Sequence, residues 1–183
     1  MDLTTPKILH FNYEQIISFV LGLPSETKQD LVAKLQINLQ ATQKAETEFW
    51  KFINLLDWTK ESNDDITQVL IKELSKKTVV EIQEFAEILH AKLAALSTQA
   101  HLEASYKNLS NEFSADEFLY IRCCVIANGQ EFYKSVLQNP DLMPQNTDFE
   151  PLLYVAEKAY FLKTGKTDFS FSPKNLTQLL NNL

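Results

Sequence analysis

Apolar residues recur every three or four positions along most of this chain, in long segments separated by short polar breaks. This spacing places the apolar side chains on one face of an α-helix, whereas a strand requires strict alternation, and no segment shows that alternation convincingly. Glycine occurs only three times in 183 residues, so the chain has few places at which helices stop. The pattern predicts an all-α protein, built as a multi-helix bundle.

The segment of about 114–128 is apolar on almost every side, and a helix of that kind belongs in the interior of a protein. Ser114 and Glu117 have the spacing of a capping box, which predicts where the helix begins. Asn128-Gly129 provides a left-handed stop, and helical spacing resumes from Gln130 to Leu137. We expect this segment to be the buried central helix of the bundle.

The N-terminal part predicts a helical hairpin. A first helix is expected over Phe11–Leu23, and a second opens at Pro24-Ser25, with Leu31, Leu35 and Leu39 as its apolar stripe. The following segment, Gln40–Glu48, is polar and fits either a linker or the exposed continuation of the second helix. We place the hairpin in residues 1–44 and a helical domain in residues 45–183.

Further helices are predicted in the larger domain. The aromatic run Phe49–Trp58 keeps helical spacing, and we interpret Trp50 and Trp58 as core or helix-packing residues. Another helix begins near Asn63 and runs to about Lys76. Thr78 and Glu81 predict a second capping box. It opens the longest regular helix, whose seam consists of Ile82, Phe85, Leu89, Leu93 and Leu96.

The C-terminal third begins with a proline-bearing loop over Asn139–Asn146. A helix is predicted to begin at Thr147–Pro151 and to end at Gly165. A short extended stretch, Thr167–Phe171, then precedes a last helix that begins at Ser172-Pro173.

Arg122, the only arginine of the chain, lies within the predicted central helix. A buried guanidinium needs a carboxylate or access to water, so we expect a carboxylate partner, for which Glu84, Glu103 and Glu157 are open candidates. Two interpretations remain: a buried ion pair that fixes the helix register, or an arginine that grips a ligand.

The charge of the chain bears on its partners. A net charge of −7 and a pI near 5 argue against general binding to nucleic acid or to anionic membranes, and a basic protein is the expected partner. Cys123 and Cys124 are adjacent in a helix and cannot form an ordinary disulfide, so we interpret them as small buried hydrophobes in a reducing compartment. With no secretory signal and no apolar run of membrane-spanning length, we expect a cytoplasmic protein.

No catalytic signature is present. The sequence has no Ser-His-Asp order, no glycine-rich phosphate loop and no metal-binding helix motif, so we assign no catalytic residue and no cofactor. His90 and His101 are eleven residues apart without a ligand pattern, so we predict no metal site and interpret both as structural or surface residues. Asp116 and Tyr120 are four apart and share a helix face, whereas Arg122 points elsewhere.

Several short segments resemble one known family. They are Glu48-Phe49-Trp50, Asp116-Glu117-Phe118, Tyr120-Ile121-Arg122, Asn128-Gly129-Gln130-Glu131 and Leu153-Tyr154-Val155-Ala156. In order and spacing they resemble the bacterial domain-of-unknown-function 4240 family, over roughly residues 48–163. The chain departs from the family pattern at Ala115, where the family has an acid, at Glu117, where it has glycine, and at Cys124, where it has tryptophan. The resemblance implies a fold but no established activity.

Two functional hypotheses follow. The first is a non-catalytic protein-interaction module, a regulatory or immunity-type binder of a basic partner. The alternative is a small-ligand-binding protein or an enzyme with a site near Asp116, Tyr120 and Arg122. A DNA-binding regulator is a third and weaker hypothesis, because the chain is acidic and has one arginine. The sequence leaves the oligomeric state open.

Overall fold

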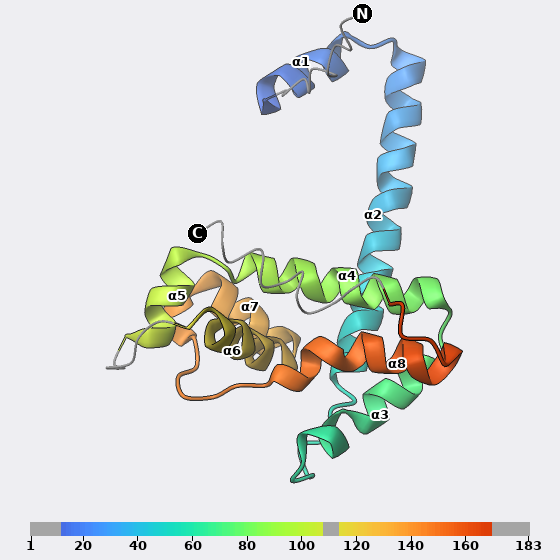
Figure 1. Ribbon diagram of the computed structural model, residues 1–183. Helices are drawn as coiled ribbons and strands as arrows, with labels where there is room; N and C mark the ends of the chain where they lie inside the picture. Colours follow the sequence, from blue (N-terminus) through green and yellow to red (C-terminus); the bar gives the residue numbers. More distant parts are fainter. Residues whose placement is uncertain (1–11, 108–113, 170–183) are drawn as a thin grey trace, which may run out of the picture. The chain divides into compact units, whose positions relative to one another are not determined.

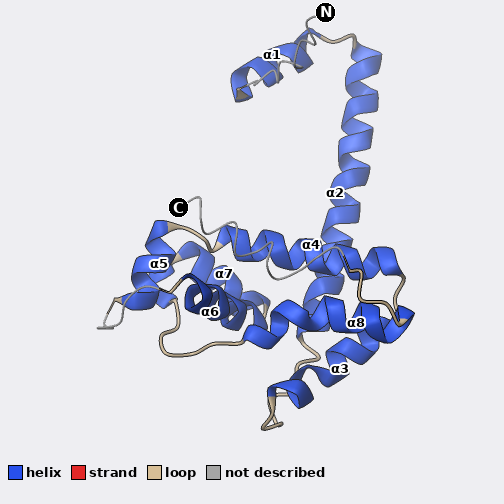
Figure 2. Cartoon of the chain, in the orientation of Figure 1, coloured by secondary structure: helices blue, strands red, loops and turns tan. Residues whose placement is uncertain are grey.

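The computed structural model describes residues 12–107 and 114–169, and these residues form helices and loops without a strand (Figures 1 and 2). The all-α prediction is therefore confirmed for the described chain. The chain divides into two compact units, residues 1–44 and residues 45–183.

The first unit contains α1 (Tyr13–Gly22) and the beginning of α2 (Ser25–Ile53). Asn12 caps α1 through a full capping box with Gln15. α2 is continuous through residues 40–48, so this polar segment is the exposed continuation of the second helix and not a linker. None of the residues of α1 is buried, and the buried residues of α2 all lie near its C-terminal end, at Phe49, Trp50 and Ile53.

The second unit contains the end of α2 and six further α-helices. They are α3 (Asn63–Ser75), α4 (Val79–Ala95), α5 (Gln99–Tyr106), α6 (Ala115–Ala127), α7 (Gln130–Gln138) and α8 (Val155–Thr164), with short 3-10 helices η1 (Pro140–Leu142) and η2 (Glu150–Tyr154). α6 contacts α4, α5, α7 and η2, and α8 packs on α3 and α4. Eight of the thirteen residues of α6 are buried, which confirms its prediction as the central helix.

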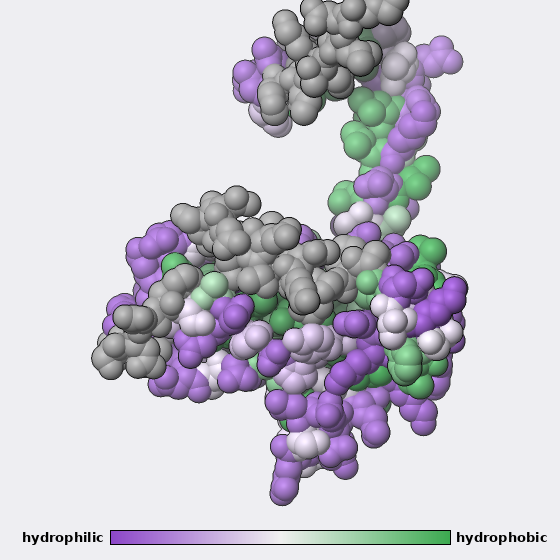
Figure 3. Space-filling view, in the orientation of Figure 1, coloured by the Kyte–Doolittle hydropathy of each residue, from purple (hydrophilic) through white to green (hydrophobic). Residues whose placement is uncertain are grey.

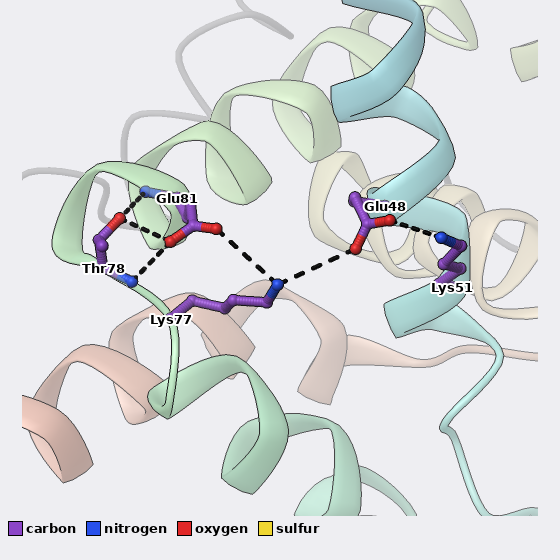
Figure 4. Close-up of polar contacts among 5 residues, drawn as sticks. All are labelled: Glu48, Lys51, Lys77, Thr78 and Glu81. Carbon is purple, nitrogen blue, oxygen red and sulfur yellow. Dashed lines mark hydrogen bonds and ion pairs between the residues drawn. The ribbon is translucent and has the colours of Figure 1, made fainter.

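The predicted capping box of α4 is present in full. The Thr78 hydroxyl accepts from the Glu81 amide, and the Glu81 carboxylate accepts from the Thr78 amide at 2.8 Å. Beside it, the Lys77 ammonium lies between Glu81 at 3.8 Å and Glu48 of α2 at 4.0 Å (Figure 4). These pairs are exposed, so each stabilises the fold by at most about 1 kcal/mol. The predicted apolar seam of α4 is buried in full, from Ile82 to Leu96.

The helix predicted over Phe49–Trp58 ends early, at Ile53. A turn follows, and the Asp57 amide donates to the Ile66 carbonyl oxygen at 3.1 Å, which ties the loop to α3. Trp50 is buried as predicted. Trp58 is 51% exposed and is therefore not a core residue, although its ring packs on Phe149 at a centroid distance of 5.0 Å.

Two glycines end helices by adopting positive φ. Gly129 has φ of 94° between α6 and α7, and Gly165 has φ of 69° after α8. Both stops lie where the sequence predicts them, but Gly129, with ψ of 173°, does not have the predicted left-handed helical conformation, whereas Gly165, with ψ of 9°, does. The segment predicted to begin a helix at Thr147–Pro151 enters it through η2. Residues 166–169 have no regular structure, and the rest of the predicted extended stretch and the helix at Ser172-Pro173 lie outside the described residues.

Candidate functional site

The start of α6 lies against α5. The Ser114 hydroxyl accepts from the Glu117 amide at 3.3 Å, which forms one half of the predicted capping box. The Tyr106 hydroxyl donates to the Ser114 carbonyl oxygen at 3.0 Å and reaches the Glu117 carboxylate at 3.4 Å. The Glu117 side chain thus contacts a tyrosine of α5 instead of closing the capping box.

Asp116 and Tyr120 lie on the one strip of α6 that is not buried. Their neighbour across the strip is Glu150 of η2, whose carboxylate also accepts from the Tyr154 hydroxyl at 2.8 Å. The Phe149 amide donates to the Tyr120 carbonyl oxygen at 3.2 Å and holds η2 beside α6. We call this surface the acidic tyrosine face; it consists of Asp116, Glu117, Tyr120, Asp148, Glu150 and Tyr154.

The electrostatics of the face are negative. The pKa of Tyr154 is raised to about 12, mainly by the hydrogen bond that its hydroxyl donates to Glu150. This bond favours the protonated tyrosine, because loss of the proton would place a second negative charge beside the carboxylate. Burial raises the pKa of Tyr120, and the charges of Glu150 and Asp116 raise it further. Among the described residues, no lysine or arginine forms an ion pair with these carboxylates.

A small hollow lies within the face, between α6 and the loop that precedes η2. Its lining includes Tyr106, Glu117, Tyr120 and residues 146–148, and its volume is about 100 Å³. Asn146 adopts a positive φ of 55° at the rim of this hollow. Small-molecule sites usually enclose about 300–1,000 Å³, so the hollow fits the end of one side chain better than a metabolite.

Arg122 does not belong to this face. Its side chain is 1% exposed and points into the core, where Nε donates to the Phe118 carbonyl oxygen at 3.2 Å and Nη1 to the Leu93 carbonyl oxygen at 2.9 Å. The guanidinium also lies over the Phe118 ring, 4.5 Å from its centroid. The structure therefore brings Asp116 and Tyr120 together and separates Arg122 from them.

The expected carboxylate partner of Arg122 is absent from the described residues, so that expectation was wrong for Glu84, Glu103 and Glu157. Leu93 lies in the last turn of α4, where carbonyl groups lack helical partners and carry the negative end of the helix dipole. The guanidinium thus caps α4. Burial lowers the pKa of Arg122 to about 10, and the group remains a cation at neutral pH.

His101 is buried near the same end of α4. Its Nδ1 lies 2.6 Å from the Thr98 hydroxyl and its Nε2 lies 3.2 Å from the Val136 carbonyl oxygen, so a neutral ring that accepts at Nδ1 and donates at Nε2 satisfies both. Burial lowers the pKa of His101, and the charge of Arg122 lowers it further. His101 was predicted to be either a structural or a surface residue; it is buried and joins α5 to α7, so its role is structural.

A second buried cation, Lys92, lies among aromatic rings. Its ammonium is within 5.0 Å of the centroids of Trp50 and Tyr133 and forms an ion pair with Glu46. Hydrogen bonding to Lys92 is the main cause that holds the pKa of Glu46 below its usual range. This arrangement links the end of α2, α4 and α7, and the helical spacing of the sequence gave no indication of it.

The thiols and the titratable groups form no further centre in the described chain. Cys123 is buried and Cys124 half-buried, and both thiols are free. Within residues 12–107 and 114–169, the His, Cys, Asp and Glu side chains do not gather in a group of three or more that would hold a metal ion. No helix in these ranges is long and apolar enough to cross a membrane.

Comparison with known proteins identifies the larger unit. A family described as "Protein of unknown function (DUF4240)" matches residues 45–161, well over half of the chain. The chain belongs to this family. No curated protein and no solved structure matches it.

The DUF4240 region contains the acidic tyrosine face and both buried cations, and the hairpin of residues 1–44 lies outside it. Two of the three departures from the DUF4240 pattern, Ala115 and Glu117, lie in the first turn of α6, and Glu117 here lines the hollow. Glu150 and Tyr154 are members of the face that sequence reasoning missed. No local pattern joins either residue to Tyr120, which lies thirty or more positions earlier in the sequence.

Proposed function

We propose that this DUF4240 protein is a non-catalytic interaction module, and that its acidic tyrosine face binds a basic segment of another protein. The observation that carries the proposal is the set of carboxylates on this face that have no cationic partner in the described chain. Some exposed carboxylates elsewhere on the same unit do pair with lysines, as Asp64 does with Lys158 at 2.7 Å. The face differs in gathering four carboxylates without such a pair, Asp116, Glu117, Asp148 and Glu150, around two tyrosines.

The tyrosines strengthen this proposal. Tyr120 and Tyr154 are half-buried, and Glu150 hydrogen-bonds with the Tyr154 hydroxyl, so the ring is held in place before a partner arrives. Rigid tyrosines lose little conformational entropy on binding and are enriched in protein interfaces. The carboxylates that raise the pKa values of these tyrosines would attract a lysine or arginine in the same way.

The hollow beside Tyr120 suits such a partner. Its volume of about 100 Å³ is well below that of the usual small-molecule site. The end of one basic side chain would fill this space and would meet Glu117 and Asp148 at its rim. A ligand-binding or enzymatic site near Asp116, Tyr120 and Arg122 receives less support, because Arg122 faces the core and caps α4.

We propose a regulatory or immunity-type role in the bacterial cytoplasm, with a basic toxin or a basic regulated protein as the partner. Two free thiols, one of them fully buried, are compatible with a reducing compartment. Electrostatic attraction would govern the rate of association, so binding should weaken steeply as salt rises.

The test uses the full chain and a synthetic arginine-rich peptide, with affinity measured by titration calorimetry at low and high salt. We expect the double variant Asp116→Asn/Glu150→Gln to bind about tenfold more weakly than the wild type. The matched control is Glu84→Gln/Glu87→Gln, which removes two exposed carboxylates of α4 and changes the net charge equally. Equal weakening in the two variants would show that only total charge matters and would refute the proposed face.

A further inference from the structure

The N-terminal hairpin leaves large apolar side chains exposed. On α2, Val32 is 52%, Leu35 60% and Leu39 58% exposed. On α1, Phe19 is 69% exposed and Ile16 49%. Figure 3 shows green, apolar side chains along the part of α2 that belongs to the first unit. Helices in water gain most of their stability from burying an apolar face, so this surface calls for a partner.

The exposed residues of α2 have a regular register. Val32, Leu35 and Leu39 are separated by three and four positions, which is the spacing of a coiled-coil seam. Lys28 and Thr42 continue the seam at its two ends. The seam covers fewer than three heptads within residues 25–44, whereas a coiled coil usually needs at least three to four. We therefore expect α1 to contribute to the contact between two copies.

The charge pattern around this seam favours a second copy of the chain. Residues 1–44 contain four lysines and four carboxylates, so the net charge of −7 falls entirely on residues 45–183. The positions that flank the seam on α2 are Gln29, Leu31, Gln36, Asn38 and Gln43, and none carries a charge. Two copies can therefore approach along this seam without opposing like charges, whereas a basic or acidic partner would find no complementary charge there.

One charged residue of the seam selects the orientation. In a parallel pair, the Lys28 side chains of both copies would face each other. In an antiparallel pair centred on Leu35, Lys28 of each copy faces Thr42 of the other. The two Lys28 residues are then about 21 Å apart along the helix, beyond the Debye length of about 8 Å at physiological salt.

We propose that the chain forms a symmetric dimer through this hairpin, with the α2 helices of two copies antiparallel about Leu35 and the α1 helices completing a four-helix bundle. This inference concerns residues outside the DUF4240 region and is independent of the acidic tyrosine face.

The test compares the full-length wild type with Leu35→Lys and Ile37→Lys in sedimentation equilibrium. Ile37 is 67% exposed on the same helix but lies on the side opposite Leu35, so it is a matched control. We expect the wild type to dimerise, Leu35→Lys to dissociate at least about tenfold more readily, and Ile37→Lys to behave as the wild type. Helical content from circular dichroism verifies that both variants fold.

A wild type that stays monomeric at high concentration would overturn the proposal, and so would equal effects of the two lysine variants. Cysteine cross-linking checks the orientation. We expect Leu35→Cys to form a disulfide between copies and Ile37→Cys to form none. Lys28→Cys should cross-link to a copy that carries Thr42→Cys but not to itself; self-linkage of Lys28→Cys would indicate a parallel pair and would refute the antiparallel dimer.

Discussion

The guanidinium of Arg122 donates a hydrogen bond of 2.9 Å to the carbonyl oxygen of Leu93, which joins the middle of α6 to the C-terminal end of α4. The residues are 29 positions apart, and the contact places the only arginine of the chain at the negative pole of a helix dipole. A substitution that removes only the charge of this side chain should therefore lower the free energy of unfolding less than one that also removes its volume.

We predict that Arg122→Ala lowers the free energy of unfolding by about 2–5 kcal/mol, because it leaves a cavity as well as an unpaired carbonyl group. Arg122→Met should cost less, because methionine fills most of the space next to Phe118. Urea denaturation measures both values. An equal loss of stability in the two variants would contradict the packing part of this explanation.

Stability should depend on pH through His101. Burial lowers the pKa of His101 in the folded state below its ordinary value of 6.5, so the unfolded chain binds the proton more readily. The stability contributed by the neutral ring is complete above pH 6.5 and declines as the pH falls below that value. Thermal melts between about pH 7.5 and pH 5 should show this slope in the wild type.

The matched control for that measurement is another histidine. His101→Gln should flatten the slope below pH 6.5, because its amide can still donate to the Val136 carbonyl oxygen but does not titrate in this range. His90→Gln, at a half-buried position of α4, should retain the slope. If His90→Gln flattened it instead, His101 would not be the group responsible.

Gly129 should be costly to replace. Its φ of 94° is unfavourable for any residue with a Cβ, and an added Cβ would meet only Asn54 Oδ1 at an ordinary contact distance of 3.8 Å. With ψ of 173°, its backbone lies in a region that essentially only glycine adopts, so the cost of Gly129→Ala is conformational and we expect about 1–3 kcal/mol. Gly22→Ala is the control, because its Cβ would enter open space at a helical position. It should increase helical content and thermal stability slightly.

The cap of α4 provides a smaller and separate test. Thr78→Ala removes the acceptor for the Glu81 amide and should cost about 1 kcal/mol. Ser135→Ala removes a hydroxyl that bonds to the Glu131 carbonyl oxygen within α7 and should have almost no effect, because alanine has the higher helix propensity. Chemical denaturation of both variants gives the comparison; similar losses would show that the cap contributes nothing specific.

Local signals predicted most of the helices. The capping residues Thr78 and Ser114 and the stops at Gly129 and Gly165 act within a few positions, so a sequence shows them directly. The helix end at Ile53 was missed because it depends partly on Asp57, whose amide bonds to Ile66 of the next helix. Such a contact has no signature among neighbouring residues.

The candidate site was predictable only in part. Asp116 and Tyr120 share a helix face by spacing alone, and the structure confirms that they lie together. Glu150 joins them from η2 through tertiary packing, which no periodic pattern encodes. The partner of Arg122 was sought among carboxylates, whereas the structure provides backbone carbonyl groups, and every residue type carries those equally.

The two tryptophans offer a spectroscopic consequence of this packing. Trp50 is 4% exposed within the core beside Lys92, whereas Trp58 is 51% exposed and contacts the ring of Phe149, the residue before Glu150. Indole emission responds to the polarity around the ring, and soluble quenchers reach exposed rings first. Trp58 is therefore an intrinsic optical probe next to the acidic tyrosine face, and Trp50 reports separately on the integrity of the core.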